Sequence, residues 1–450
     1  MKRIIFALTA LSLVSGCGVL KGRDKPVTPT VGQRIPVLTG EASVEVDPGL
    51  ADVAIALPPM ETNAAWTQPG GNAAHSMGHL ALGSALAQAW SVQAGTGSSQ
   101  RARLAAAPVV ADGRVYVVDV NAMLRAFDAT SGARVWEAQI GERTGGRSLW
   151  NGEFTGNSGT LFGGGVSYDN GRVYATSGNG DVVAFDAATG AQIWRVRPGG
   201  PLRGAPTIAQ DNIYVVSQDN QLYALSPADG ALRWTGTGTL ELAGVFGAAA
   251  PAAASGTVVA GYSSGELTAY RYENGRTVWQ DALARTSIST AVGSLSDIDA
   301  EPVIDQGRVY AVGQGGRMVA VELATGQRIW EINLAGISTP WVAGEWIFVV
   351  TDQAQLLAIA RATGRVKWMT QLPRYRNEAK RSGPISWVGP VLAGNRLILA
   401  SSRGNLVNVS PFDGAIQSTI NTKQSYSLPL VVANSTLYLL SDEGRLTAWR

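Results

Sequence analysis

The chain has 450 residues, and its 36 Lys and Arg against 34 Asp and Glu leave a formal net charge of only +2. A nearly neutral body argues against nucleic acid as the main partner. The single cysteine excludes a disulfide within the chain, so stability must come from a hydrophobic core, and 54 glycines indicate many turns and sheet.

Residues 1–16 have the form of a secretory signal peptide, with a basic start, a short apolar run and two small residues at the end. The apolar run is too short to span a bilayer. The only cysteine, Cys17, comes next, and "LVSGC" resembles the bacterial lipobox. That resemblance implies cleavage before Cys17, which then carries lipid, and the Gly18 that follows favours the outer membrane. The alternative is a plain signal peptide with an incidental cysteine.

Residues 17–60 follow as a proline-rich segment with one short candidate strand at 34–38. We predict that this segment is a flexible, lipidated tether. A coil of this length averages roughly 35 Å from end to end, so it would hold the body near the membrane without setting its orientation.

From residue 106 onward, two short phrases recur along the chain. "RVYVVD" at 114–119 is followed by "MLRAFDATSGARVW" at 123–136, and "RVYATS" at 172–177 by "VVAFDAATGAQIW" at 182–194. Six copies end in tryptophan, the seventh has Ser418 at that place, and the eighth stops at Arg450. Alternating apolar segments predict strands, and the glycine between the last two predicts a hairpin turn.

Four-stranded units repeated eight times predict an all-β fold, an eight-bladed β-propeller with four antiparallel strands per blade, over residues 61–450. A solenoid is the alternative, but it would need capping repeats. The last copy lacks an outer strand, whereas "LAQAWSV" at 86–92 has a tryptophan and no strands before it. We therefore expect this segment to complete the C-terminal blade and close the ring, with Trp90 buried beside Leu446–Trp449.

One tryptophan at a fixed place in each unit favours a wedge between neighbouring blades over a role in ligand stacking. A small residue recurs in the third strand of the units, and we expect it where the blades crowd together. These residues are Ala126, Ala184, Ala224, Ala269, Ala320, Ala358 and Ala448.

The sequence offers little that could carry out a reaction. His75 and His79 are the only histidines, and their spacing could place two metal ligands on one helix face. No third ligand lies beside them, so we expect no metal site. Without a catalytic triad or a P-loop, we also predict no catalytic residue and no cofactor, and hence no enzyme.

The repeat resembles the Trp-docking motif of the quinoprotein family, which Ala184, Asp186, Thr189, Gly190 and Trp194 match in full. That family includes dehydrogenases that use pyrroloquinoline quinone, usually with calcium and often with a vicinal disulfide. A single cysteine cannot form that disulfide, and the chain shows no compact set of cofactor ligands. The motif therefore implies the fold and not the reaction, and a periplasmic quinone-dependent dehydrogenase is the competing functional hypothesis.

Lipobox, tether, eight repeats and closing strand together resemble the BamB family of lipoproteins in the outer-membrane β-barrel assembly machinery. The resemblance implies a non-enzymatic scaffold, held by lipid at the periplasmic face of the outer membrane. The implied partners are the POTRA domains of BamA and other Bam lipoproteins, with unfolded outer-membrane proteins as a further candidate. A propeller that serves another envelope complex is the third hypothesis.

Long connections between units are the candidate partner sites. In a propeller, the connections from each outer strand to the next inner strand share one face, and four are long here: 141–163, 235–248, 284–300 and 373–387. Long connections on a rigid scaffold often carry binding residues. The second and third flank one unit, so we expect them to be neighbours.

These two connections carry apolar residues beside acids. Leu240 and Leu242 lie in "TLELAG", and Asp297 and Asp299 lie in "SLSDID". Such a combination suits a protein partner with an apolar patch and a basic rim. The BamB resemblance implies that these four residues dock BamA, although Ala243 stands where the family has arginine. The alternative is that the leucines pack the loop and the acids cap turns.

Overall fold

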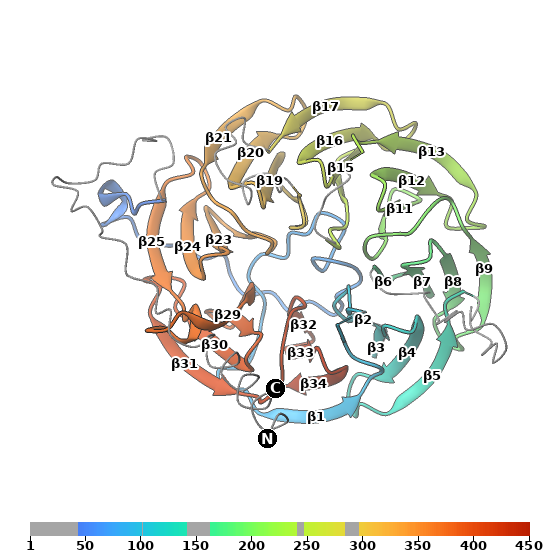
Figure 1. The fold of residues 1–450 in the computed structure, drawn as a ribbon, viewed down its shortest axis with the longest axis horizontal. Coiled ribbons are helices and arrows are strands. Elements are labelled where there is room, and N and C mark those ends of the chain that lie inside the picture. The colour runs from blue at the N-terminus through green and yellow to red at the C-terminus, as the bar shows by residue number, and fades with distance from the viewer. Residues whose placement is uncertain (1–43, 101, 142–162, 241–246, 284–296) are drawn as a thin grey trace, which may run out of the picture. The chain divides into compact units, whose positions relative to one another are not determined.

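The protein is a ring of eight four-stranded antiparallel sheets in this computed structural model (Figure 1). The structure describes residues 44–100, 102–141, 163–240, 247–283 and 297–450. Hydrogen bonds join the strands of each sheet, or blade, in order from the central channel outward. The predicted all-β, eight-bladed propeller is confirmed, and the solenoid alternative is wrong because the two ends of the strand series pair with each other.

The blades follow one another around the ring in chain order, and each contains a short inner strand, two central strands and an outer strand (Figure 1). Blade 1 comprises β2 (Val109–Ala111), β3 (Arg114–Val118), β4 (Met123–Asp128) and β5 (Arg134–Gln139), and blade 2 comprises β6 (Gly164–Asp169), β7 (Arg172–Ser177), β8 (Val182–Asp186) and β9 (Gln192–Val196). Blade 3 comprises β10 (Thr207–Ala209), β11 (Asn212–Val216), β12 (Gln221–Leu225) and β13 (Leu232–Thr237), and blade 4 comprises β14 (Ala252–Ala254), β15 (Thr257–Gly261), β16 (Glu266–Arg271) and β17 (Thr277–Ala282).

The remaining blades repeat this arrangement, except that blade 8 takes its outer strand from the N-terminal part of the chain. Blade 5 comprises β18 (Val303–Asp305), β19 (Arg308–Gly313), β20 (Arg317–Glu322) and β21 (Arg328–Ile332), and blade 6 comprises β22 (Trp341–Ala343), β23 (Trp346–Val350), β24 (Gln355–Ala360) and β25 (Val366–Gln371). Blade 7 comprises β28 (Trp387–Ala393), β29 (Arg396–Ser401), β30 (Asn405–Val409) and β31 (Ile416–Asn421), and blade 8 comprises β32 (Val431–Ala433), β33 (Thr436–Leu440), β34 (Arg445–Trp449) and β1 (Gln88–Gln93).

Burial within a blade explains the two kinds of sequence pattern. Central strands face neighbouring blades on both sides, so β11 is buried along its whole length and reads as a continuous apolar run. The outer strand β13 of the same blade alternates between exposed and buried residues. Among the described residues, no helix has the length and apolarity of a membrane span.

Adjacent blades are joined by a tryptophan on one outer strand that stands on a glycine in the next blade. This glycine has positive φ and lies in the turn before the outer strand of its blade. A Cβ built on it would lie only 2.5–2.9 Å from the nearest atom of the indole. Each indole Nε1 also donates a hydrogen bond to a backbone carbonyl of that turn. The pairs are Trp90–Ala129, Trp136–Ala187, Trp194–Pro227, Trp234–Tyr272, Trp279–Leu323, Trp330–Arg361 and Trp368–Pro411.

The recurring alanines lie directly opposite these tryptophans in the strand register, as Ala184 does opposite Trp194. All seven predicted alanines are fully buried, which confirms that they lie where the blades crowd together. Blade 7 differs, because Asn408 lies opposite Ser418 and donates a 2.8 Å hydrogen bond to it. In blade 8 the strands β34 and β1 are far apart in the chain and are not joined by a turn. A tryptophan at position 418 would therefore find no turn glycine to pack against.

Ring closure follows the prediction closely. β1 pairs antiparallel with β34, and Trp90 lies opposite Ala448. The Trp90 ring packs 6.0 Å from the ring of Tyr438, and its Nε1 lies 3.2 Å from the carbonyl oxygen of Ala129 in blade 1. Trp90 is half-buried rather than fully buried as predicted.

Residues 63–80, which we call the belt, make one circuit of the central channel (Figure 1). They contact every blade in the order of the ring. This segment was not predicted from the sequence. Glu61 bonds to His79 and Ala81, so the ends of the circuit are tied together. The contacts are Asn63 with blade 8, Trp66 with blade 1, Thr67 with blade 2, Gln68 with blade 3, Ala73 with blade 4, Ala74 with blade 5, Gly78 with blade 6 and Leu80 with blade 7.

The described end of the predicted tether, residues 44–60, contacts blade 6. Val46 forms a parallel bridge with Val366 at the start of β25, and the short 3-10 helix η2 (Pro48–Leu50) follows. Lys367 donates a 2.8 Å hydrogen bond to the carbonyl of Leu50. The chain therefore reaches the propeller at an outer strand before it enters the channel.

We predict that Gly132→Ala destabilises the protein more than Gly113→Ala. Both glycines lie in turns of blade 1 at positive φ, +75° and +69°. A Cβ at Gly132 would lie 2.7 Å from the Trp90 ring, whereas a Cβ at Gly113 would meet nothing within 4 Å. Backbone strain costs about 1–2 kcal/mol in either variant, and overpacking adds about 1–3 kcal/mol only at Gly132.

The measurement is the urea midpoint at unchanged m-value. Equal shifts for the two variants would show that the closing indole does not need the glycine beneath it.

Candidate functional site

The structure separates the four residues that the sequence singled out for partner binding. Leu240, at the end of the chain segment that follows β13, is 61% exposed, more than any other large apolar side chain among the described residues. Asp297 is completely buried, and the Asp299 side chain is only 7% exposed. Leu242 and the lipidation candidate Cys17 lie outside the described residues.

Leu240 is exposed on a segment that two blades hold in place. The preceding residue, Thr239, donates from its backbone nitrogen and its hydroxyl to the Glu266 carboxylate of blade 4, at 2.7 and 2.6 Å. Asn220 of blade 3 donates a 2.6 Å hydrogen bond to the Thr239 carbonyl. An exposed leucine next to a fixed backbone suits an apolar anchor, because little conformational freedom is left to lose when a partner binds.

The two acids face inward rather than toward a partner, which corrects the expectation of surface carboxylates. Asp299 Oδ1 accepts from Arg203 Nη2 at 3.1 Å, and its Oδ2 accepts from Gln314 Nε2 at 2.8 Å. Burial raises the pKa of the Asp299 carboxyl to about 7, although the Arg203 guanidinium acts to lower it. Both acids lie just before the inner strand β18, where the chain is already packed between neighbouring connections, so their spacing in the sequence does not indicate exposure.

Arg203 ties three consecutive connections together. It lies at the start of blade 3, donates from Nε to the carbonyl of Gly247 before blade 4 at 3.2 Å, and pairs with Asp299 before blade 5. A Cβ at Gly247 would lie 1.3 Å from Asp299 Oδ1, so glycine is required at this approach. The expectation that connections 235–248 and 284–300 are neighbours is confirmed at these described residues.

The two other long connections have different outcomes. Connection 141–163 lies outside the described residues except at its ends. Connection 373–387 forms a hairpin of β26 (Tyr375–Asn377) and β27 (Ser382–Pro384), where the Glu378 carboxylate accepts from the backbone nitrogens of Arg374 and Tyr375. Those hydrogen bonds lower the pKa of Glu378.

The histidines hold the belt and do not form a pair of metal ligands. His75 Nδ1 lies 2.7 Å from the carbonyl of Pro302, and His79 Nδ1 lies 2.8 Å from that of Pro58. The segment is irregular, so the helical spacing that would align the two rings is not realised. In the described part of the chain, no group of three or more His, Cys, Asp or Glu side chains could hold a metal ion.

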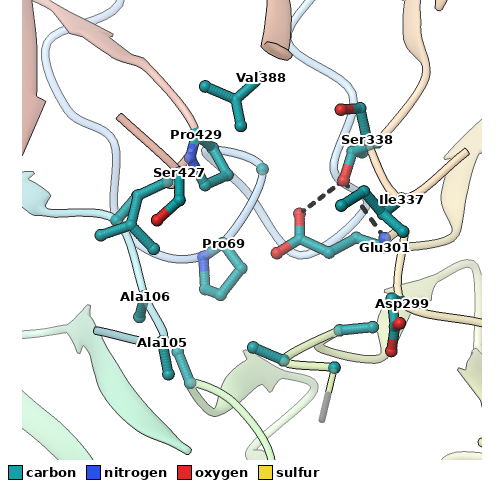
Figure 2. Close-up of a pocket in the computed structure, with 18 of the residues that line it drawn as sticks. Pro69, Ala105, Ala106, Asp299, Glu301, Ile337, Ser338, Val388, Ser427 and Pro429 are labelled. Atoms are coloured by element: carbon teal, nitrogen blue, oxygen red, sulfur yellow. Dashed lines mark hydrogen bonds between the residues drawn. The ribbon is translucent and has the colours of Figure 1, made fainter. Parts of the chain in front are cut away.

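A cavity of about 670 Å³ lies on the channel axis, where the first residues of several inner strands meet the belt (Figure 2). Its lining includes Trp66 and Pro69 of the belt, Arg203, Asp299 and Glu301. Sequence reasoning missed the cavity, because its residues are scattered over most of the chain and only ring closure brings them together.

A ring of eight four-stranded blades joined by docked indoles defines a propeller of the quinoprotein type, with its candidate site on the outer-to-inner connections. Within that class, the family model described as outer membrane protein assembly factor BamB matches residues 66–144 and 139–370. The match spans more than half of the chain, so the chain belongs to the BamB family.

Individual relatives agree with this assignment. BamB of Escherichia coli K12 is 27% identical over 339 residues, which cover 75% of this chain and 82% of that protein. BamB of Yersinia pestis is 26% identical over 337 residues, which cover 74% and 81%.

Solved structures show the same fold. BamB from Moraxella catarrhalis aligns with a TM-score of 0.66 at 20% identity, over 81% of this chain and 100% of that chain. Quinohemoprotein alcohol dehydrogenase from Comamonas testosteroni aligns with a TM-score of 0.63 at 14% identity, over 86% and 80%. Likeness at such low identity concerns the fold alone.

We predict that Asp299→Asn changes how stability depends on pH. The pKa of the Asp299 carboxyl is about 7 in the folded state, compared with an ordinary value of 3.8. Between these two pH values the folded protein keeps a proton on this carboxyl that the unfolded protein releases. The contribution to stability is therefore full below about pH 4 and is lost as pH rises through 7. The difference in urea midpoint between wild type and Asp299→Asn should shrink or reverse across this range.

The exposed Glu345→Gln serves as the control for the loss of a surface carboxylate. A flat difference for Asp299→Asn would contradict the raised pKa.

Proposed function

We propose that this chain is an outer-membrane protein assembly factor that acts as a non-enzymatic scaffold. The family match over residues 66–370 carries the proposal. On this view the chain joins the Bam complex, docks the POTRA domains of BamA, and meets other Bam lipoproteins and unfolded outer-membrane proteins. The closed ring supplies a rigid platform, and the outer-to-inner connections supply the contacts.

The proposed docking site centres on Leu240. Burying an exposed leucine at a protein interface contributes about 1.5–3 kcal/mol, and Thr239 already holds the adjacent backbone. Leu242 belongs to the same proposal as a second apolar anchor. Asp299 takes a different role from the one first expected, since it organises the connections from inside through Arg203, and Asp297 is completely buried.

The dehydrogenase alternative lacks support from the residues. A quinoprotein's vicinal disulfide needs two cysteines, and the chain has one. The described carboxylates also do not gather into a group that would suit calcium. The residues therefore do not fit the quinone and calcium of that family, and the relatives that match are named as assembly factors.

We predict that Leu240→Asp abolishes capture of purified BamA POTRA domains while the melting curve stays unchanged. A carboxylate placed in an apolar contact must lose its hydration without a partner, which costs several kcal/mol. Leu232→Asp is the matched control, because Leu232 lies on the same blade at the opposite end of β13 and is 54% exposed. It should leave capture intact.

Full capture by a folded Leu240→Asp protein would move the docking site elsewhere. Loss of capture by both variants would instead indicate a general effect of added charge.

We also propose that lipid on Cys17 anchors the protein at the periplasmic face of the outer membrane. Cys17→Ala should then leave the propeller folded but shift it from the outer-membrane fraction to the soluble periplasmic fraction. The experiment needs cells that lack the other Bam components, because protein partners could retain the variant at the membrane. Membrane association that persists in such cells would refute the lipid anchor.

A further inference from the structure

The axial cavity has no part in the proposed scaffold function, yet its lining is that of a ligand site. Apolar side chains from blades 6, 7 and 8 form much of the wall, among them Trp341, Val388 and Leu428. Pro69 of the belt is part of the same lining (Figure 2). A mostly apolar cavity of about 670 Å³ with a few convergent polar groups has the size and character of a small-molecule site.

Glu301 is the first of these polar groups, and its side chain extends into the cavity (Figure 2). Among the described residues, its carboxylate accepts one long hydrogen bond, from the Thr339 hydroxyl at 3.5 Å. Burial raises the pKa of the Glu301 carboxyl to about 7. A carboxylate in apolar surroundings with so little compensation is costly to ionise unless a cation accompanies it.

His75 is the second, and its tautomer follows from its contacts. Its Nδ1 lies 2.7 Å from the carbonyl oxygen of Pro302, which can only accept, so Nδ1 carries the proton. Nε2 therefore presents a lone pair. The residue is 3% exposed and lines the cavity, but its Nε2 is covered by neighbouring atoms and has no hydrogen-bond partner among the described residues, so it is not open to a ligand. Desolvation lowers the pKa of His75 to about 4, so the ring stays neutral near pH 7.

The other charged groups at the cavity leave Glu301 uncompensated. Arg203 pairs with Asp299 at 3.1 Å, so these two charges offset each other. Arg103 is exposed to solvent. Glu301 and His75 come from adjoining positions, since His75 bonds to Pro302 directly after Glu301. One hydrogen-bond acceptor that is able to carry a negative charge, the Glu301 carboxylate, thus lies at one side of an apolar cavity.

We propose that the axial cavity binds an organic cation, an ammonium, amidinium or guanidinium group on an apolar body. Its N–H groups donate to the Glu301 carboxylate, and its apolar part packs against Trp341 and Val388. Such a cation satisfies the carboxylate in both charge and hydrogen bonding, whereas an anion or a neutral hydrocarbon does not.

The cation has two possible sources. It is either a free small molecule or a Lys or Arg side chain that a docked protein inserts from the connection side. The second source rests on the proposed function, and the first does not.

Isothermal titration calorimetry of the full chain with benzamidine tests the proposal, with benzyl alcohol as the neutral control. Binding needs the ionised carboxylate, so affinity scales with the ionised fraction of Glu301. With its pKa about 7, benzamidine should bind about tenfold more tightly at pH 8 than at pH 6. Benzyl alcohol should show no such dependence. Absence of benzamidine binding at millimolar concentration would overturn the proposal.

Variants assign the effect to the cavity. Glu301→Gln should abolish benzamidine binding at pH 8, and the exposed Glu345→Gln should leave it unchanged. Asp299 titrates in the same range, so Asp299→Asn is included and should keep the tenfold pH dependence. Ile337→Trp, at a cavity-lining position that is 47% exposed, should block binding by filling space even if Glu301→Gln fails to fold. Unchanged binding in Glu301→Gln or Ile337→Trp would overturn the assignment.

Competition separates the two sources. If captured POTRA domains displace benzamidine, a partner's side chain is the cation; if both bind together, the natural ligand is a free molecule. Leu240→Asp should bind benzamidine normally, so failure of the docking site and failure of the cavity site are distinguishable.

Discussion

The docking of one indole onto a glycine of the next blade is the contact on which the ring depends. A four-stranded sheet cannot bury both of its faces alone, so each blade needs its neighbours. The indole fills the space that a missing Cβ leaves and satisfies its N–H on a turn carbonyl, as Trp194 does over Gly230 and Pro227. The contact recurs around the ring and stops only before blade 8, where no turn can receive it.

Closure in turn makes the central channel, and the belt occupies it. Residues 63–80 bond to every blade in order, so the segment can take this path only in a closed ring of this size. The belt also covers polar backbone at the inner strands that would otherwise line an open channel. Trp66 stacks on Trp341 at 6.3 Å, where the belt and a blade together form one wall of the axial cavity.

The same closure brings the connections to one face. Arg203, Gly247 and Asp299 precede three consecutive blades, and their contacts hold those connections in one arrangement. Leu240 stays exposed at the start of one of these connections, on a backbone that Thr239 fixes to Glu266. The described parts of these connections thus combine buried ion pairing near the channel with an exposed apolar side chain at Leu240.

The sequence by itself determined the repeat, the strands and the closing role of Trp90, because those depend on local alternation and on short turns with glycine. It also drew attention to Leu240 as an apolar residue in a long connection, and the structure then showed that its side chain is exposed. Only the tertiary structure decided that Asp297 and Asp299 face inward and that His75 and His79 hold a belt. The axial cavity likewise joins Glu301 to residues far away in the chain. Such placements arise from contacts across the closed ring, which no local pattern of residues records.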